Sequence, residues 1–443
     1  MTTWPRRPAA DWLSVTEARR RVLALVRPLP SESASLDDAL GRALAEPVFA
    51  GATLPPWDNS AMDGYAVRGE DITGASSRSP IELAVLGEAR AGVPWEGELG
   101  TGQAVRIMTG GPLPEGADSV VRVEDTDGEA RTGWVQVRSD RDRGRNRRPG
   151  GQDMRAGDHL LPAGHRLDAA AVAIASAAGR SAVSVHRRPS AGVLTSGDEL
   201  RGPDTFEDVG AGRGIPDSNG PMLVAACREL GICAVPLGPV ADRAEAVRTS
   251  LEEARHSELD LLVTVGGASM GGTDHFRDVL GAMGAEHDFW RVRMRPGSPF
   301  SAGTLPRAGR AVLPILGLPG NPASAFVTFH LFVRAALLRQ AGHRHVDLPV
   351  VTALARSELR GGVKLTHFLR VSLEADEGGL FAMPTGPPGS GLVRGLAGAD
   401  GLAIIPQGVE RIPAGGSASV MLLRLPSAGD LARLAPRGPQ GEL

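Results

Sequence analysis

The feature that most constrains the fold is an alternation of apolar strands and amphipathic helices between about Val183 and Gln340. The expected strands are Ala191–Thr195, Ile232–Leu237, Leu259–Val265, Phe289–Arg295 and Ala311–Leu316. The expected helices are Asn219–Leu230, Arg243–Arg255, Asp274–Met283 and one that begins near Asn321, with Pro322 in its first turn. Strands that alternate with helices pair in parallel and carry helices on both faces. This stretch therefore predicts a three-layer α/β fold around a parallel sheet.

The stretches on either side of this alternation have the pattern of β-structure. Short apolar runs between glycines and prolines occupy about Gly51–Gly151, and similar runs follow His343. The expected strands there are Ile81–Leu86, Ala104–Met108, Ser119–Val123, Trp134–Val137, Val350–Ala355, Phe368–Leu373, Leu380–Met383, Leu402–Ile405 and Ala418–Leu425. We therefore expect mixed or β-rich N-terminal domains and a small C-terminal β-barrel or sandwich.

Three further helices are expected outside the alternation. Ser14 and Glu17 have the spacing of a capping box, in which a serine side chain accepts a hydrogen bond from the amide three residues later. A second helix is expected at Leu36–Leu44, with Ser35 as its cap. The alanine-rich run Ala169–Ala178 predicts the third.

Composition excludes several classes of protein. The formal net charge of −3 lacks the broad basic surface of a nucleic-acid binder. Cys227 and Cys233 match no zinc or redox spacing, and His343 and His345 have no third ligand nearby. No apolar run approaches the roughly 20 residues that cross a bilayer, and the N-terminal residues lack the apolar core of a secretory signal. We expect a cytoplasmic protein that binds neither nucleic acid nor membrane.

A glycine-rich segment after the most apolar strand is the strongest local signal of a binding site. Residues 259–276 read LDLLVTVGGASMGGTDHF, with four small residues of interest before Asp274, namely Gly266, Gly267, Ser269 and Gly271. Glycines let backbone N–H groups approach an anion, and a helix start adds partial positive charge. The segment also follows the carboxyl end of a strand, where open α/β sheets bind ligands. An ordinary glycine-rich turn explains it equally well.

Acidic residues follow another expected strand. Residues 192–200 read GVLTSGDEL, which places Thr195, Ser196, Asp198 and Glu199 at the strand end. Carboxylates beside a phosphate site commonly hold Mg²⁺ or position water. A polar loop with a helix cap is the simpler explanation, both here and for the DSN sequence that begins at residue 217.

The segment FWRVRMRPGSPF, residues 289–300, carries three arginines at alternate positions. In a strand, Arg291, Arg293 and Arg295 would share one face. Three like charges repel one another there unless solvent or an anion compensates them. The segment is therefore either a solvated edge or a clamp for an oxyanion or phosphate, to which guanidinium groups are well matched.

Two further segments are ambiguous when each is taken alone. GLPGNPASA, residues 317–325, is either a second anion-binding helix start or an ordinary set of residues that end a strand and begin a helix. PPWDNSAMDGYAV, residues 55–67, sets a dense polar cluster that includes Asp63 in an apolar frame. Such a cluster is costly to bury without partners, so it is either solvated or part of a site.

Taken together and in this order, the segments resemble the molybdopterin molybdenumtransferase family. That family includes the bacterial enzyme of the last step of molybdenum cofactor assembly and the E domain of gephyrin. The matching segments, between about Leu13 and Ala325, are PPWDNSAMDGYAV, RIMTGGPLPEGADSVVRVED, GRNRRPGGQDMRAGD, TSGDEL, DSNGPML, VGGASMGGTD, RPGSPF and GLPGNPAS. Their shared order makes a chance match negligible.

The resemblance implies four domains. Domain I would combine residues 1–50 and 150–186, domain II would be the β-rich insertion 51–149, domain III the α/β molybdopterin-binding domain 187–342, and domain IV the β-barrel 343–427, followed by a flexible tail at 428–443. The resemblance also implies an elongated homodimer. Its active cleft would lie between domain III of one subunit and the N-terminal domains of the other.

The resemblance assigns roles to individual residues as well. The implied catalytic residues are Asp63, Thr109, Glu199, Asp242 and Asp274, and Glu199 and Asp274 would also hold Mg²⁺. The residues implied to bind the pterin, its phosphate end or molybdate are Asp153, Thr195, Gly266, Gly267, Ser269, Gly271, Arg291, Arg295, Ser298, Pro319, Gly320, Asn321 and Pro322. Asp63 and Thr109 would reach the site from the other subunit of the dimer.

The activity that the resemblance implies is insertion of molybdate into the dithiolene of adenylyl-molybdopterin, with release of AMP. Molybdopterin adenylyltransferase would be the upstream partner. The family commonly has lysines in the basic strand and in a PGKP turn, whereas this chain has arginines and Ser298. The lost charge at Ser298 motivates an alternative, a catalytically weakened paralogue that acts as a pterin-binding or scaffold protein. A general nucleotide- or phosphate-binding α/β enzyme is a third hypothesis.

Overall fold

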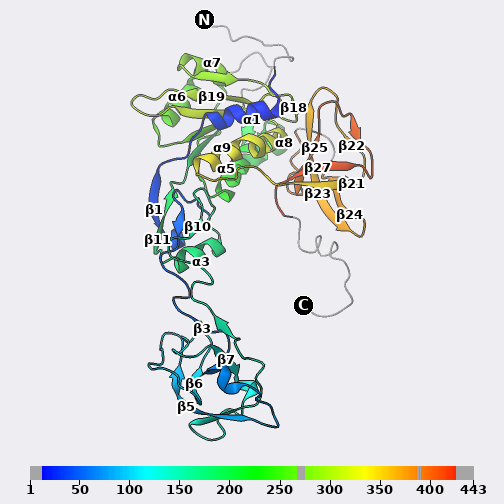
Figure 1. Ribbon diagram of the computed structural model, residues 1–443. Coiled ribbons are helices and arrows are strands. Elements are labelled where there is room, and N and C mark those ends of the chain that lie inside the picture. Colours follow the sequence, from blue (N-terminus) through cyan, green and yellow to red (C-terminus); the bar gives the residue numbers. More distant parts are fainter. Residues whose placement is uncertain (1–11, 267–274, 387–388, 390, 426–443) are drawn as a thin grey trace.

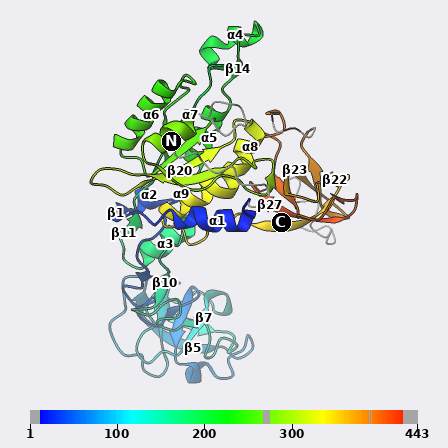
Figure 2. The same ribbon diagram turned by 90° about the horizontal axis from the view of Figure 1, so that it is seen from above.

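The computed structural model describes residues 12–266, 275–386, 389 and 391–425. The chain is elongated, with an α/β region at one end, a β-rich region at the other, and a narrow region of short strands between them (Figure 1). A C-terminal β-barrel lies beside the α/β region in both views (Figure 1 and Figure 2). Within the described part of the chain, no helix is long and apolar enough to cross a membrane.

The α/β region is built on a six-stranded sheet with the order β15-β12-β16-β20-β19-β17. Its strands are β12 (Ser190–Thr195), β15 (Cys233–Pro236), β16 (Leu261–Val265), β17 (Glu286–Phe289), β19 (Ser301–Leu305) and β20 (Leu313–Leu318). The first four strands of this order are parallel, whereas β19 and β17 join in antiparallel register. The predicted parallel sheet is confirmed, and an antiparallel edge extends it.

Helices cover both faces of this sheet and complete the three predicted layers. They are α5 (Asn219–Glu229), α6 (Ala244–His256), α7 (His275–Ala282), α8 (Pro322–Thr328) and α9 (Arg334–Gln340), and a π-helical turn at Phe329–Val333 joins the last two. One core packs α6 and α7 against Leu262 of β16, and the other packs α5, α8 and α9 against Val263. Because neighbouring residues of β16 enter opposite cores, this strand is buried on both faces, as its largely apolar sequence predicts.

The predicted strand Phe289–Arg295 is wrong as a single element. β17 ends at Phe289, and β18 (Met294–Arg295) pairs with the C-terminal barrel. Val292 and Met294 are completely buried, whereas the arginines beside them are not. The alternation of burial that suggested a strand is therefore real. The segment crosses from one sheet to another, and a period of two does not distinguish such a crossing from a continuous strand.

The N-terminal helix α1 (Val15–Ala24) packs its apolar face into the same core as α5. The Ser14 hydroxyl accepts a hydrogen bond from Glu17 N at 3.1 Å, which confirms the predicted cap. The Glu17 carboxylate binds Arg20 and Arg21 at 2.7 and 2.8 Å, and these hydrogen bonds lower the pKa of Glu17 to about 2.

The narrow region is assembled from two separate stretches of the chain. Strand β1 (Ser31–Ser35) pairs with β11 (Ala182–His186), and β2 (Val48–Phe49) pairs with β10 (His159–Leu161). The predicted alanine-rich helix is α3 (Ala169–Ala177), and its buried residues share a core with these strands. Figure 1 shows that this core connects the α/β region to the β-rich region.

The helix α2 (Leu36–Ala39) is shorter than the predicted helix at Leu36–Leu44. Gly41 N and Leu44 N donate to carbonyl groups in the 165–167 segment at 2.7 and 3.0 Å. These tertiary hydrogen bonds occupy amides that a longer helix would have paired internally. The helix therefore ends after one turn, because partners distant in sequence satisfy the backbone beyond it.

The β-rich region contains a five-stranded sheet with the order β7-β4-β6-β5-β8. Its strands are β4 (Gly64–Val67), β5 (Ile81–Ala89), β6 (Gln103–Ile107), β7 (Ser119–Arg122) and β8 (Trp134–Val137). A two-stranded pair, β3 (Asn59–Ser60) with β9 (Arg147–Arg148), adjoins it. Four of these strands were predicted, and their ends differ from the prediction by at most three residues.

The C-terminal region closes into a barrel. Its strands are β21 (Val350–Ala355), β23 (Thr366–Asp376), β24 (Gly379–Pro384), β25 (Gly401–Ile405) and β27 (Ser417–Leu422). The order β23-β24-β21-β27-β25 returns to β23 through a further pairing with β25, so the five strands form a barrel and not a sandwich. The smaller elements are β13 (Leu200–Arg201), β14 (Ile215–Pro216), α4 (Phe206–Gly210), β22 (Leu359–Arg360) and β26 (Arg411–Ile412).

Candidate functional site

Three parallel strands of the α/β sheet end side by side. β12, β16 and β20 end at Thr195, Val265 and Leu318, which are paired across the sheet. Gly266 follows β16 with φ at 112°, and an added Cβ would lie 2.9 Å from Ser196 O. Only glycine fits this turn without strain. Backbone geometry therefore requires the first glycine of the predicted glycine-rich segment.

Two acidic residues from helix starts are held at the end of β12. The Thr195 hydroxyl donates to Asp217 at 3.2 Å, and the other oxygen of Asp217 accepts from Gly220 N at 3.0 Å. The Ser196 hydroxyl donates to Asp242 at 3.3 Å. Asp217 precedes α5 and Asp242 precedes α6, so each helix brings a carboxylate to the strand end. We call Thr195, Ser196, Asp217 and Asp242 the strand-end cluster.

Asp198 and Glu199 extend this cluster outward. Asp198 Oδ1 accepts a hydrogen bond from Asp242 N at 3.0 Å. Glu199 is exposed, and its carboxylate lies over Gly197, where an added Cβ would be 2.7 Å away. The predicted site residues that lie outside the described residues are Gly267, Ser269, Gly271 and Asp274. Among the described residues, no group of three or more His, Cys, Asp or Glu side chains is arranged to hold a metal ion.

The Pro319–Pro322 turn joins β20 to α8 at the same edge of the sheet. Asn321 is the N-cap of α8, and Pro322 lies in its first turn, as predicted. The Asn219 amide, at the start of α5, donates to Gly320 O at 2.6 Å. Asn219 is 8% exposed, and its Oδ1 accepts no hydrogen bond from any described residue. The Asn219 bond ties the starts of two helices together beside the strand-end cluster.

The three arginines of the basic segment do not share a strand face, contrary to the prediction. The guanidinium group of Arg291 lies over the ring of Trp12, 5.0 Å from its centroid. Arg293 is partly buried, whereas Arg295 is exposed on β18. Because β17 ends before these residues, the period-two argument that grouped them does not apply. Of the three, Arg295 is the most exposed and is available to an anion.

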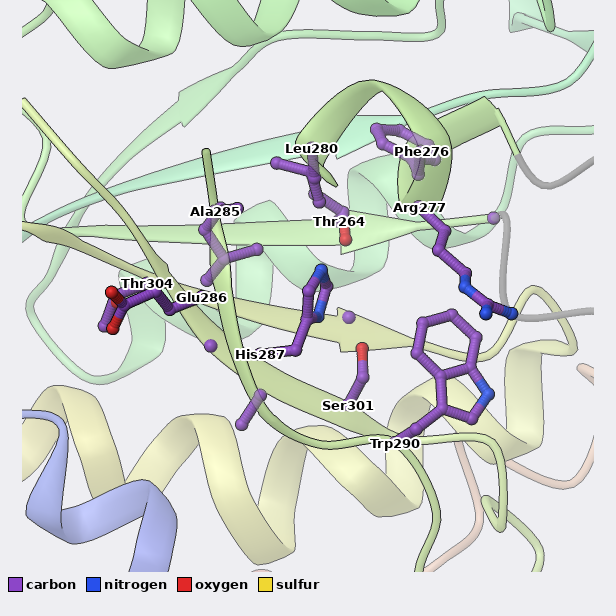
Figure 3. Close-up of a pocket in the computed structure, with 15 residues that line it drawn as sticks. Thr264, Phe276, Arg277, Leu280, Ala285, Glu286, His287, Trp290, Ser301 and Thr304 are labelled. Carbon is purple, nitrogen blue, oxygen red and sulfur yellow. The ribbon is translucent and has the colours of Figure 1, made fainter. Parts of the chain in front are cut away.

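A small pocket of about 20 Å³ opens beside the strand ends, between α7 and β17 (Figure 3). The guanidinium group of Arg277 lies 5.6 Å from the ring centroid of Trp290. His287 projects between Thr264 and Ser301 in Figure 3. Burial, together with the positive charge of Arg277, lowers the pKa of His287 to about 4, so its imidazole is neutral at pH 7.

Asp63 and Thr109 meet in the β-rich region. Thr109 donates to Asp63 Oδ1 from its backbone N at 2.7 Å and from its hydroxyl at 2.8 Å. These hydrogen bonds lower the pKa of Asp63, so this exposed carboxylate is charged at neutral pH. Asp63 precedes β4 and Thr109 follows β6, and these two strands are paired. Asp153 is exposed in the same region, and its N donates to Leu54 O at 3.1 Å.

The predicted site residues therefore fall into two groups within one chain. The strand-end cluster and the Pro319–Pro322 turn belong to the α/β region. Asp63 and Thr109 belong to the β-rich region, at the opposite end of the elongated chain (Figure 1). The narrow region separates the two groups, and one subunit alone does not bring them together.

Three family models match consecutive parts of the chain. The MoeA N-terminal region (domain I and II) matches residues 13–179. A probable molybdopterin binding domain matches residues 192–339. The MoeA C-terminal region (domain IV) matches residues 352–423. The three matches follow the order of the β-rich, α/β and barrel regions.

Named relatives match nearly the whole chain. The molybdopterin molybdenumtransferase of Bacillus subtilis is 34% identical over 418 residues, which cover 93% of this chain and 94% of the relative. Molybdopterin molybdenumtransferase 2 of Mycobacterium tuberculosis is 35% identical over 408 residues, which cover 91% and 97%. The chain belongs to the molybdopterin molybdenumtransferase family. A solved molybdopterin biosynthesis MoeA protein from Pyrococcus horikoshii OT3 has a TM-score of 0.77 at 26% identity, over 93% of this chain and 100% of that one.

This molybdenumtransferase family member differs from the lysine-containing pattern at Ser298. The Ser298 hydroxyl donates to Met294 O within the same turn. The neighbouring Gly297 packs against α8, since an added Cβ there would lie 2.5 Å from Thr328 Cγ2. The turn therefore keeps its place beside α8 without a lysine, and Ser298 contributes a structural hydrogen bond where a charge is common.

Some residues at this site were not predicted from the sequence of this molybdenumtransferase family member. The DSN sequence at 217–219 was explained by helix capping. Asp217 does accept a hydrogen bond from Gly220 N, but Asn219 also binds Gly320, which is 101 residues away in sequence. Arg277 and His287 were not singled out, because no local pattern predicts that α7 and β17 meet around one pocket. The sequence offered one signal for this contact. Asp217 is sufficient to cap α5, so Asn219 is not needed as a cap and is free for another role.

Proposed function

We propose that this chain transfers molybdate to the dithiolene of adenylylated molybdopterin and releases AMP. The observation that carries the proposal is the strand-end cluster, in which α5 and α6 deliver Asp217 and Asp242 to the end of β12 beside the Gly266 turn. Open α/β sheets bind ligands at the carboxyl ends of their strands. Relatives that carry the transferase name match more than nine-tenths of the chain.

In this proposal, fixed polar groups position the two substrates. The phosphate end of the pterin lies at the Gly266 turn, which an added Cβ would obstruct. Molybdate is a tetrahedral dianion that needs positive groups and N–H donors, and Arg295 and the Pro319–Pro322 turn supply them. The protein contributes mainly orientation and electrostatic stabilisation, which are large terms in catalysis.

We also propose Mg²⁺ as the cofactor, held by Glu199 and Asp274. Glu199 offers hard carboxylate oxygens from an exposed position, next to the strand-end cluster. Mg²⁺ is commonly held by only one or two carboxylates, with substrate phosphates and water completing its coordination. Bound there, it would neutralise charge on the phosphates as AMP departs.

The separation of Asp63 and Thr109 from the strand-end cluster supports a shared active site. One chain presents the two groups at opposite ends, so they meet only if two chains pair with the β-rich region of one against the α/β region of the other. We therefore propose a homodimer in which each active site uses both subunits. Cyclic pairing of two identical chains is the commonest form of oligomer.

The remaining assignments follow from the same proposal. The substrate carries an adenylyl group, so a molybdopterin adenylyltransferase must act before this enzyme. The cytoplasm stays the predicted location. The relatives named above are transferases, and no feature of the described residues favours a pterin-binding scaffold instead.

The experiment that tests the proposal is release of AMP from adenylylated molybdopterin by the purified full chain. We expect release that depends on molybdate and on Mg²⁺, and a parallel series with tungstate measures the effect of the arginines and Ser298 on oxyanion choice. Pterin binding without AMP release at any molybdate concentration would contradict the proposal and would favour a scaffold.

A further inference from the structure

A second pocket lies where the narrow region meets the α/β region. Its volume is about 210 Å³, and it lies between residues 40–42 and 186–189 of the narrow region and the C-terminal ends of α5 and α9. Because α5 begins at the carboxyl edge of the sheet, its C-terminal end lies at the opposite edge, away from the strand-end cluster. The volume is many times the roughly 10–15 Å³ that a cavity needs to hold one water molecule. We call this the junction pocket.

The junction pocket is lined predominantly by positive side chains. Its charged lining residues are Arg42, Arg166, Arg188, Arg228 and Glu229. The lining therefore includes four arginines and one glutamate. The ends of α5 and α9 together add about one unit of negative charge, and Glu32 pairs with Arg42 from outside the lining. The positive charges still exceed the negative ones.

Arg42 is the buried base of this pocket. Its side chain is only 10% exposed, it forms an ion pair with Glu32, and it donates to His186 O at 2.9 Å. Its Nε is buried and has no hydrogen-bond partner among the described residues. A buried donor on a charged group costs free energy when it lacks a partner. Because solvent does not reach Nε, a ligand in the pocket would not bind it, and Arg42 contributes only its positive charge.

The other three arginines stand at the mouth of the pocket. Arg166, Arg188 and Arg228 are exposed, and none of them forms a salt bridge within the described part of the chain. Arg188 reaches only Asp38 O, at 3.5 Å. Arg228 lies in the last turn of α5, where a positive residue also compensates the helix dipole. That role explains Arg228, and the ion pair with Glu32 explains Arg42, so Arg166 and Arg188 are the two arginines without a structural role.

The pKa of His343 is consistent with an excess of positive charge in the junction pocket. His343 lines the pocket, and its pKa is lowered to about 4, first by burial and then by the positive charges of Arg166 and Arg334 and by His186. The surroundings therefore disfavour one more positive charge. An anion in the pocket would reverse that effect, because it would compensate the guanidinium groups.

We propose that the junction pocket binds a small phosphate-containing anion, of the size of phosphate or pyrophosphate. Guanidinium groups match phosphate oxygens with paired N–H donors, and the exposed Arg166, Arg188 and Arg228 supply them. The anion bridges the narrow region, through Arg42 and Arg166, to the α/β region, through Arg228. This site is separate from the proposed active site and does not depend on the transferase activity.

Calorimetric titration of the full chain with pyrophosphate, and separately with phosphate, at constant ionic strength tests this proposal. We expect saturable binding of one or both anions by the wild type. The double variant Arg166→Ala/Arg188→Ala should weaken binding at least about tenfold, because each lost charge-assisted hydrogen bond is worth about that much. Arg248→Ala, an exposed arginine on α6, is the matched control and should stay within about twofold of the wild type.

The Arg295→Ala variant distinguishes this pocket from the proposed molybdate site. Binding that survives Arg295→Ala and is lost in the double variant supports the junction pocket. Binding that is lost in Arg295→Ala but persists in the double variant places the anion at the active site and overturns the proposal. Absence of saturable binding by the wild type overturns it as well. Both mouth arginines are exposed, so circular dichroism should show that the double variant folds.

Discussion

The strand-end cluster and the Asp63–Thr109 pair are both acidic, but they are held in different ways. At the strand end, Asp217 and Asp242 are fixed by hydroxyl groups of β12 and by the starts of two helices. Asp63 is fixed by the single residue Thr109, on an exposed surface of a separate region. The first arrangement is organised within one chain, as the proposed ligand site requires. The second is a charged group presented outward, as a contribution to a site on another chain requires.

The comparison predicts the largest effect for a substitution at the strand-end cluster. Asp242→Asn keeps the size of the side chain but removes its charge, so AMP release should fall by about a hundredfold. Its melting temperature should change little, because Asp242 is exposed. Rates of AMP release under saturating substrate check this expectation. Glu377→Gln, an exposed acid in the barrel, is the control, and an Asp242→Asn enzyme as active as that control would remove the cluster from the mechanism.

A glycine substitution tests whether the strand end is organised by its own backbone. Gly266→Ala introduces a Cβ against Ser196 O at a positive φ, and it should cost about 1–3 kcal/mol of unfolding free energy. Gly202→Ala is the matched control, because Gly202 has φ at −74° and open space around it. Urea denaturation measures both variants. Equal stability of the two would show that the Gly266 turn does not constrain the chain as described.

A smaller effect is expected at the far end of the chain. Asp63→Asn retains an acceptor for Thr109 but loses the charge that the lowered pKa maintains. We expect AMP release to fall by about tenfold with an unchanged melting temperature. Glu82→Gln, an exposed acid of the same region, serves as the control. Undiminished activity of Asp63→Asn would leave the β-rich region without a catalytic contribution.

The smallest expected effect per residue distinguishes the two regions by pH. Burial lowers the pKa of His287, His330 and His343 to about 4, and all three belong to the α/β region. Their stabilisation is fully present above the unfolded pKa, near 6.5, and is lost as the pH falls from there toward 4. The free energy of unfolding should therefore drop between pH 7 and pH 5, by on the order of 1 kcal/mol per histidine. The lowered pKa of Asp63 matters only below its ordinary value of 3.8, so the β-rich region should be insensitive in this range.

Urea denaturation at the two pH values, followed by region-resolved proteolysis, measures this difference. His330→Phe removes one buried histidine and should reduce the pH dependence, whereas His256→Gln, at an exposed position, should leave it unchanged. A loss of stability at pH 5 that is equal in both regions would count against burial as the cause.

The sequence predicted the layers of the fold because burial repeats along the chain. Leu259–Val265 is apolar except at Asp260 and Thr264, and the observed β16 (Leu261–Val265) is buried at every position. Phe289–Arg295 was predicted as one strand, in which Val292 and Met294 alternate with arginines. Both apolar residues are buried, yet the chain changes sheets there. The second helix was predicted too long because partners at 165–167 take its amides. Local patterns report burial, and they do not report which distant partner causes it.

The site was predictable only where its residues follow strand ends. Thr195 ends one strand that the apolar pattern located and Gly266 follows another, so their proximity was foreseeable. The Asp63–Thr109 contact joins residues 46 apart in sequence, and no periodicity connects them; the family resemblance alone brought them forward. The Asn219–Gly320 bond and the pocket around His287 depend on tertiary contacts, which have no signature in a single sequence.

The central claim is that each active site takes its acidic strand-end cluster from one chain and Asp63 from the other. Coexpression of Asp63→Asn and Asp242→Asn chains, separated only by purification tags, tests it directly through AMP release. In a mixed dimer, one site receives both substitutions and the other receives neither. A random mixture should therefore recover about a quarter of wild-type activity, although each variant alone is impaired. Activity no higher than the average of the two variants would contradict the claim and would place the complete site within one chain.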